Sequence, residues 1–106
     1  MANNYACDMN ALTKEQRLRH SELAKLLHPE VVRFIELPNG YSAEIGDGFA
    51  EEVNEFCKLE ILCCPFFELE VSDLGEKTML SITGNGEIKP FIRAEFGIPS
   101  GEAPDA

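Results

Sequence analysis

Two short turns, each lying between two segments of β-type sequence, constrain the fold of this 106-residue chain more than any other feature. Pro38-Asn39-Gly40 is the first turn, and Asp73-Leu74-Gly75-Glu76-Lys77 is the second. The flanking segments either are rich in β-branched and aromatic residues or alternate between apolar and polar residues. They are residues 31–37, 41–45, 67–72 and 78–83. Because connections this short join antiparallel neighbours, the sequence predicts two β-hairpins.

The first predicted helix runs from Thr13 to about Leu27. Thr13 followed three residues later by Gln16 is a capping-box pair, which marks a helix start. Leu23, Leu26 and Leu27 cluster on one side, which we expect to face the core. A proline two residues beyond Leu27 cannot continue the helix and is expected to end it.

The second predicted helix runs from Phe49 to about Leu62. Asp47 or Gly48 is expected to cap its first turn. Apolar residues recur along it at helical spacing, and this repeat places Cys57 on the apolar face.

The third predicted helix runs from Glu87 to about Phe96, with Pro90 in its first turns, where proline is tolerated. The element order is therefore α-β-β-α-β-β-α. Joined hairpins share a sheet, so we expect an α+β fold with a four-stranded, mainly antiparallel sheet, helices on one face and glutamates on the open face. Residues 1–98 are expected to form this single domain. Residues 99–106 lack large apolar side chains and are expected to form a flexible C-terminal tail.

The strongly acidic composition excludes some classes of partner. The formal net charge is −10, so phosphate backbones and anionic lipid surfaces would be repelled, and we expect neither nucleic acid nor a membrane as a partner. No signal-peptide pattern or membrane-spanning apolar run is present in the sequence. We therefore expect a cytoplasmic protein, monomeric or homodimeric, whose cysteines are mostly reduced.

The most informative motif for function is the adjacent pair Cys63-Cys64, followed by Pro65 at the end of the second predicted helix. Thiolates are good ligands for soft ions such as Hg(II), Cu(I) and trivalent arsenic, and for borderline Zn(II). Two neighbouring thiols cannot complete a tetrahedral zinc site, so a further ligand is needed. Cys7 is the candidate because its segment, ahead of the first helix, is free to approach the pair, and Asp8 offers a harder ligand. The sequence thus predicts a metal site of Cys7, Cys63 and Cys64.

Two other interpretations of the cysteines stay open. In the first, the chain is a thiol-disulfide or metal-reducing accessory enzyme with a Cys63-Cys64 or Cys7-Cys64 disulfide. The C-terminus of a helix disfavours a thiolate, which weakens this interpretation. In the second, the chain is a partner-binding module whose cysteines only pack in the core, the role expected for Cys57. No hydrolase or nucleotide-binding motif occurs in the sequence, so we favour a binding protein over an enzyme.

The histidines are not expected to belong to the site. His20 and His28 lie eight residues apart on the first predicted helix and point in different directions, so each is expected at the surface or partly buried. Acidic runs such as Glu51-Glu52 are expected to form a solvated face.

Three stretches of the chain carry a resemblance to known proteins. Residues 60–66 read Glu-Ile-Leu-Cys-Cys-Pro-Phe, residues 80–84 read Leu-Ser-Ile-Thr-Gly, and residues 91–96 read Phe-Ile-Arg-Ala-Glu-Phe. With these motifs the chain resembles small uncharacterised bacterial proteins that share a Glu-Arg-x-Cys-Cys-Pro-Phe signature and are associated with mercury and other heavy-metal resistance loci.

This resemblance implies that Cys7, Cys63 and Cys64 are the shared thiols of the family, and it leaves out Cys57. The chain departs from the signature at Ile61, where the family carries arginine. Without a neighbouring cation to hold a thiolate, the pKa of the thiols should be higher. Our leading hypothesis is a soft metal or metalloid ion binding protein that uses clustered thiols, as an accessory in heavy-metal resistance.

Overall fold

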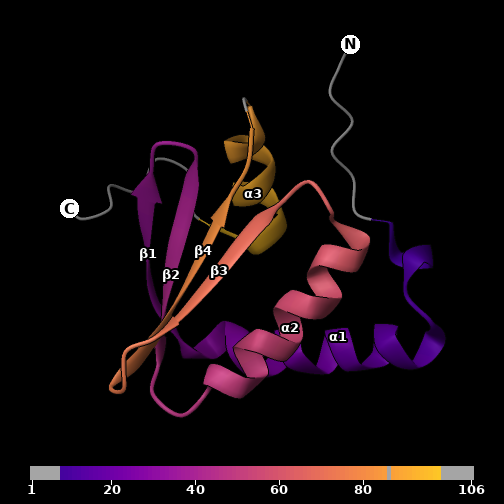
Figure 1. The fold of residues 1–106 in the computed structure, drawn as a ribbon, viewed down its shortest axis with the longest axis horizontal. Helices are drawn as coiled ribbons and strands as arrows, with labels where there is room; N and C mark the ends of the chain where they lie inside the picture. Colours follow the sequence, from indigo (N-terminus) through magenta and orange to yellow (C-terminus); the bar gives the residue numbers. More distant parts are fainter. Residues whose placement is uncertain (1–7, 86, 99–106) are drawn as a thin grey trace.

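Both predicted hairpins are present in the structure, a computed structural model that describes residues 8–85 and 87–98. The first consists of β1 (Val31–Leu37) and β2 (Gly40–Gly46), and the second consists of β3 (Glu68–Asp73) and β4 (Lys77–Thr83). They join through β2 and β4 into one antiparallel four-stranded sheet with the order β1-β2-β4-β3 (Figure 1). The predicted α+β fold and its element order are confirmed.

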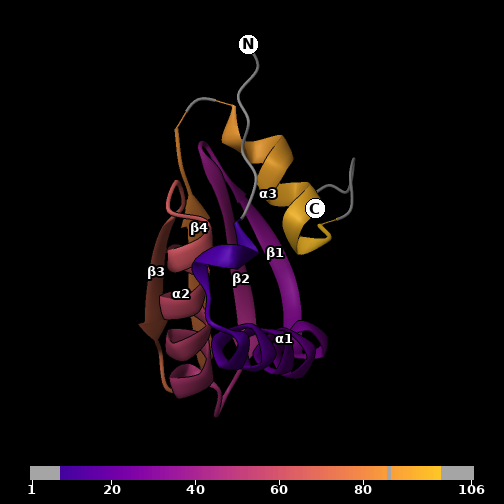
Figure 2. The same ribbon diagram turned by 90° about the vertical axis from the view of Figure 1, so that its right-hand side faces the viewer.

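Three α-helices lie on one face of this sheet (Figure 2). They are α1 (Lys14–Leu27), α2 (Ala50–Cys63) and α3 (Ile88–Phe96), and the 3-10 turns η1 (Met9–Ala11) and η2 (His28–Glu30) flank α1. The three helices and the sheet bury a shared apolar core between them.

The alternation of side chains along the strands decides which residues face the helices. Tyr41 and Ala43 of β2 are buried, and they lie opposite the buried Ile82 and Leu80 of β4. Since successive side chains of a strand point to opposite faces, Glu44 of β2 points away from the helices.

The open face of the sheet carries glutamates, as expected, together with two cations. Glu68 and Glu70 are exposed on β3. Glu44 accepts a hydrogen bond from Arg33 Nε at 2.9 Å, and Lys77 Nζ lies 4.0 Å from the same carboxylate. The hydrogen bond from Arg33 holds the pKa of the Glu44 carboxyl below its usual range.

The starts of the first two helices differ in how they are capped. Thr13 Oγ1 accepts from the Gln16 backbone N–H at 3.1 Å, and Gln16 Oε1 accepts from the Thr13 backbone N–H at 2.9 Å, so the predicted capping box is confirmed. The predicted cap of α2 is wrong, because the N-cap residue is Phe49, whose side chain makes no capping hydrogen bond. Gly48, with a φ of 91°, turns the chain in the left-handed region and moves the helix start past the expected residue.

The buried face of α1 is narrower than the sequence indicated. Leu23 and Leu27 are buried, whereas Leu26 is 42% exposed. Residues four positions apart lie on one line along a helix, so Leu23 and Leu27 reach the core together while Leu26 is turned toward solvent.

The third helix, α3, contributes buried apolar side chains to the core. Ile88 and Ile92 are fully buried on its inner side, and Pro90 lies in the first turn, as predicted. Gly97 ends the helix in the left-handed conformation, with a φ of 67°. The expected C-terminal tail, residues 99–106, lies outside the described residues.

Thr13→Ala removes one half of the capping box. We expect it to lower the free energy of unfolding by about 1 kcal/mol, because the Gln16 N–H loses its acceptor. Urea unfolding followed by circular dichroism measures the change. Ser21→Ala, at an exposed position inside the same helix, is the matched control and should change stability by no more than about 0.5 kcal/mol. Equal stability of Thr13→Ala and the wild type would contradict a stabilising role for the box.

Candidate metal centre

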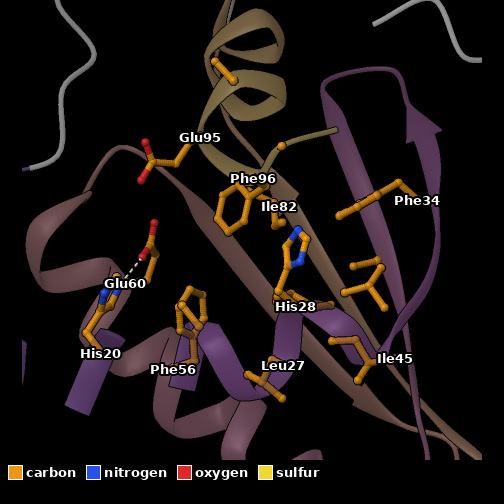
Figure 3. Close-up of a pocket in the computed structure, with 16 residues that line it drawn as sticks. His20, Leu27, His28, Phe34, Ile45, Phe56, Glu60, Ile82, Glu95 and Phe96 are labelled. Atoms are coloured by element: carbon orange, nitrogen blue, oxygen red, sulfur yellow. Dashed lines mark hydrogen bonds and ion pairs between the residues drawn. The ribbon is translucent and has the colours of Figure 1, made fainter. Parts of the chain in front are cut away.

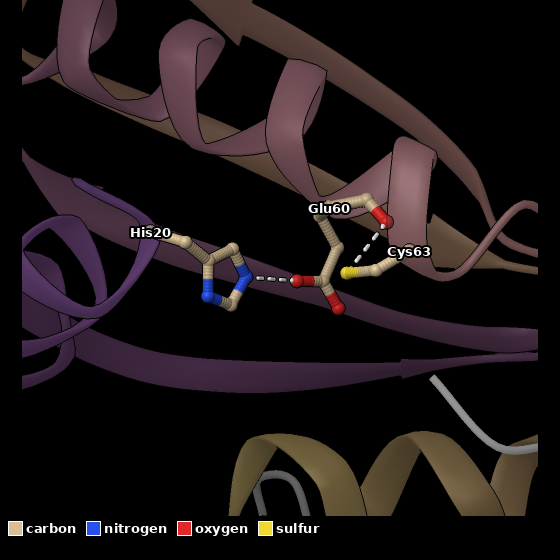
Figure 4. A group of neighbouring side chains, drawn as sticks. All are labelled: His20, Glu60 and Cys63. Atoms are coloured by element: carbon tan, nitrogen blue, oxygen red, sulfur yellow. Dashed lines mark hydrogen bonds and ion pairs between the residues drawn. The ribbon is translucent and has the colours of Figure 1, made fainter. Parts of the chain in front are cut away.

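A buried pair of polar side chains joins α1 to α2. The imidazole N–H at His20 Nε2 donates to Glu60 Oε1 at 2.7 Å, and the two side chains are only 14% and 2% exposed (Figure 4). The ring of Phe56 stacks on the imidazole with a centroid distance of 5.0 Å. An ionised carboxylate is costly to bury without a hydrogen-bond donor, so the imidazole offsets the burial of Glu60.

The two adjacent cysteines lie one turn further along α2. Cys63 is the last residue of the helix and Cys64 is its C-cap, and the following proline prevents another helical turn. Residues three and four positions after Glu60 lie on its side of the helix, which brings both sulfur atoms near its carboxylate. The two Sγ atoms are 3.7 Å apart, and Cys64 Sγ lies 3.4 Å from Glu60 Oε2. The Cys63 thiol donates to the backbone carbonyl of Glu60 at 3.5 Å (Figure 4).

These side chains form a set of donor atoms that fits a metal ion. The ligand atoms of His20, Glu60 and Cys63 all lie within 4.8 Å of one another. Glu60, Cys64 and Glu95 form a second, overlapping set within the same limit. In a tetrahedral zinc site the ligand atoms are separated by roughly 3.3–3.8 Å, given bond lengths of about 2.0–2.3 Å. Because the ligand atoms already lie within 4.8 Å of one another, small side-chain movements would bring them to this spacing.

The electrostatics of this cluster favour the protonated forms of Cys63 and Glu95. Burial, with a further contribution from the charge of Glu60, raises the pKa of the Cys63 thiol to about 11. Burial and the charge of Glu60 also raise the pKa of the Glu95 carboxyl, and His20 partly offsets this rise. The last carbonyl groups of α2 add negative potential at the same place. A cation that displaces these protons would therefore enter a favourable field.

The structure places the predicted thiol ligands as follows. Cys63 and Cys64 are both buried and lie together. Cys64 is disulfide-bonded, whereas Cys57 and Cys63 are free thiols. Cys7 lies outside the described residues, so its predicted place in the site is not tested. Cys57 packs against the core as expected, and burial raises the pKa of its thiol to about 12.

Asp8, considered as a harder ligand, has a different role in the structure. Its side chain accepts a hydrogen bond from the Asn10 backbone N–H at 3.0 Å and so caps the turn η1. Its backbone N–H donates to the Cys63 carbonyl at 2.8 Å. This second bond holds Asp8 against the end of α2.

Sequence reasoning missed three members of the two overlapping sets, namely His20, Glu60 and Glu95. His20 is partly buried, as expected, and belongs to the candidate cluster, whereas His28 is exposed and is not among the members of the cluster. A signal was available in the spacing, because His20 lies three residues before Leu23 on the buried face of α1. Glu60 likewise interrupts the apolar repeat of α2, where a charged residue needs a partner.

The chain was compared with known proteins. No protein-family model matches it, and no curated protein or solved structure matches it. The resemblance to heavy-metal resistance proteins therefore stays a prediction. In the described part of the chain, none of the helices has the length and apolar character needed to cross a membrane.

His20→Leu would leave the Glu60 carboxylate buried without its imidazole donor. We expect a loss of about 3 kcal/mol in the free energy of unfolding. The double variant His20→Leu, Glu60→Leu removes both polar groups and should be more stable than the single variant, since packed apolar side chains replace the pair. Urea unfolding of the wild type, the double variant and the single variants His20→Leu and Glu60→Leu measures the coupling, with exposed His28→Leu as the control histidine. A double variant no more stable than His20→Leu would contradict the pairing.

Proposed function

We propose that the protein binds one soft or borderline metal ion at the end of α2, with Cys63 as the central sulfur ligand and His20 and Glu60 beside it. One observation carries this proposal: a nitrogen of His20, a carboxylate oxygen of Glu60 and the sulfur of Cys63 lie within 4.8 Å of one another at a buried position. Each of the three is a common ligand of Zn(II), and sulfur also selects Cu(I) and Hg(II).

The thiols beside Cys63 decide which ion is preferred. In the reduced protein, Cys64 offers a second sulfur, because its Sγ atom lies 3.7 Å from Cys63 Sγ. We assign the third thiol to Cys7. The Asp8 nitrogen, which donates to the Cys63 carbonyl at 2.8 Å, is covalently bonded to the carbonyl carbon of Cys7, and this supports the assignment. Three thiolates favour Hg(II) or Cu(I), whereas one thiolate with an imidazole and a carboxylate favours Zn(II).

A role as an accessory in heavy-metal resistance follows from the sequence resemblance and belongs to this proposal. The acidic composition of the chain, with a net charge of −10, suits a protein that takes up cations.

A second candidate function is thiol-disulfide exchange. It is favoured by the contact between the free Cys63 thiol and the disulfide-bonded Cys64, whose sulfur atoms are 3.7 Å apart. The raised pKa of the Cys63 thiol opposes it, because only the thiolate attacks a disulfide. A metal titration of the reduced protein separates the two functions, since an exchange protein without an ion site gives no adduct.

Native mass spectrometry of the reduced protein with one equivalent of Zn(II) or Hg(II) tests the metal site. We expect a single-ion adduct with each metal. Cys63→Ser should weaken Zn(II) binding by at least about 100-fold, since a ligand is lost. Cys57→Ser, at a free thiol that does not belong to the cluster, is the matched control and should bind as the wild type does. Unchanged affinity in Cys63→Ser would remove the basis of the proposal.

The affinity for Zn(II) should also depend on pH. The pKa of the Cys63 thiol is raised to about 11, so the thiol is protonated at neutral pH and the ion must displace its proton. The apparent affinity should therefore rise by about tenfold per pH unit between roughly pH 6 and 8 for each proton released. Competition titrations with a chelator of known affinity measure this slope. An affinity independent of pH would show that no thiol proton is displaced.

A further inference from the structure

An apolar pocket of about 360 Å³ lies between α1, α3 and the helix-covered face of the sheet. This volume lies within the range of pockets that hold small organic ligands. Phe34, Ile45 and Phe96 are among its apolar walls, whereas Glu60 and Glu95 lie together on one side of it (Figure 3). The pocket therefore has an apolar body and a polar end.

The polar end has an acidic character. The carboxylate oxygens of Glu60 and Glu95 lie within 4.8 Å of each other, and Glu60 is almost completely buried. Two imidazoles also line the pocket: that of His20, which uses Nε2 to bond Glu60, and that of His28, which lies farther from the two carboxylates (Figure 3). The two neighbouring carboxylates offer hydrogen-bond acceptors that suit a cationic donor group of a ligand better than a neutral or anionic one.

We propose that this pocket binds a small apolar molecule that ends in an ammonium group, with the apolar body against the sheet and the ammonium at Glu60 and Glu95. An ammonium has three N–H donors and no acceptor, which matches an end formed by carboxylates. This binding function goes beyond the metal site. The two sites share Glu60, so an ion and an amine compete for one carboxylate.

The test uses metal-free reduced protein and three probes of the same size. Benzylamine carries the ammonium, benzyl alcohol is its neutral counterpart, and benzoate is its anionic counterpart. Titrations followed by amide chemical shifts of the whole chain give each Kd and the place of binding. We expect the amine to bind about fivefold more tightly than the alcohol, benzoate to bind most weakly, and the shifts to centre on residues that line the pocket.

Two variants check the two halves of the proposal. Glu95→Gln should remove most of the preference for the amine over the alcohol, whereas Glu51→Gln, an exposed glutamate in the first turn of α2, should keep it. Ala24→Leu, at a residue that lines the pocket, should weaken the binding of both probes at least about fivefold by filling the apolar body. Equal binding of amine and alcohol to the wild type, or an amine preference that Glu95→Gln leaves unchanged, would overturn the proposal.

Cys63→Ser separates this proposal from the proposed metal function. Cys63 is not among the residues that line the pocket, so the variant should bind benzylamine as the wild type does while it loses Zn(II). Zn(II) binding without any amine preference in the wild type would overturn the amine site and leave the metal site standing. A preference for the amine without Zn(II) binding would overturn the metal site and leave the amine site standing.

Discussion

The hydrogen bond between His20 and Glu60 is the interaction on which both candidate sites depend. It holds a buried carboxylate in the contact between α1 and α2, where an unpaired charge would be costly. The same carboxylate lies beside the two cysteines on one side and Glu95 on the other. Glu60 therefore links the metal cluster to the polar end of the pocket, and a change at this residue affects both.

Most of the fold could be predicted because its determinants are local. The turn at Pro38-Asn39-Gly40 and the capping box at Thr13 each specify structure within a few residues, and both predictions were confirmed. The cap of α2 was not predicted correctly, because the choice between Gly48 and Phe49 depends on the conformation of one glycine rather than on a side-chain signal.

The candidate site could be predicted only in part, because half of it is a tertiary contact. Cys63 and Cys64 are neighbours in the sequence, so their proximity needs no knowledge of the fold. His20 and Glu60 are 40 residues apart, and they meet only because α1 and α2 pack on the same face of the sheet. Periodicity indicates which side of each helix is buried, but it does not indicate which turn of one helix meets which turn of the other.

The strand order β1-β2-β4-β3 has a consequence for how the protein folds. Each half of the chain forms one α-β-β unit, and the units are joined at the centre of the sheet by β2 and β4. His20 belongs to the first unit, and Glu60 and Cys63 belong to the second. Neither unit alone holds His20, Glu60 and Cys63 together. A bound ion would therefore stabilise only the folded state in which the two units are packed against each other. Binding of the ion and folding of the whole chain would then be thermodynamically coupled.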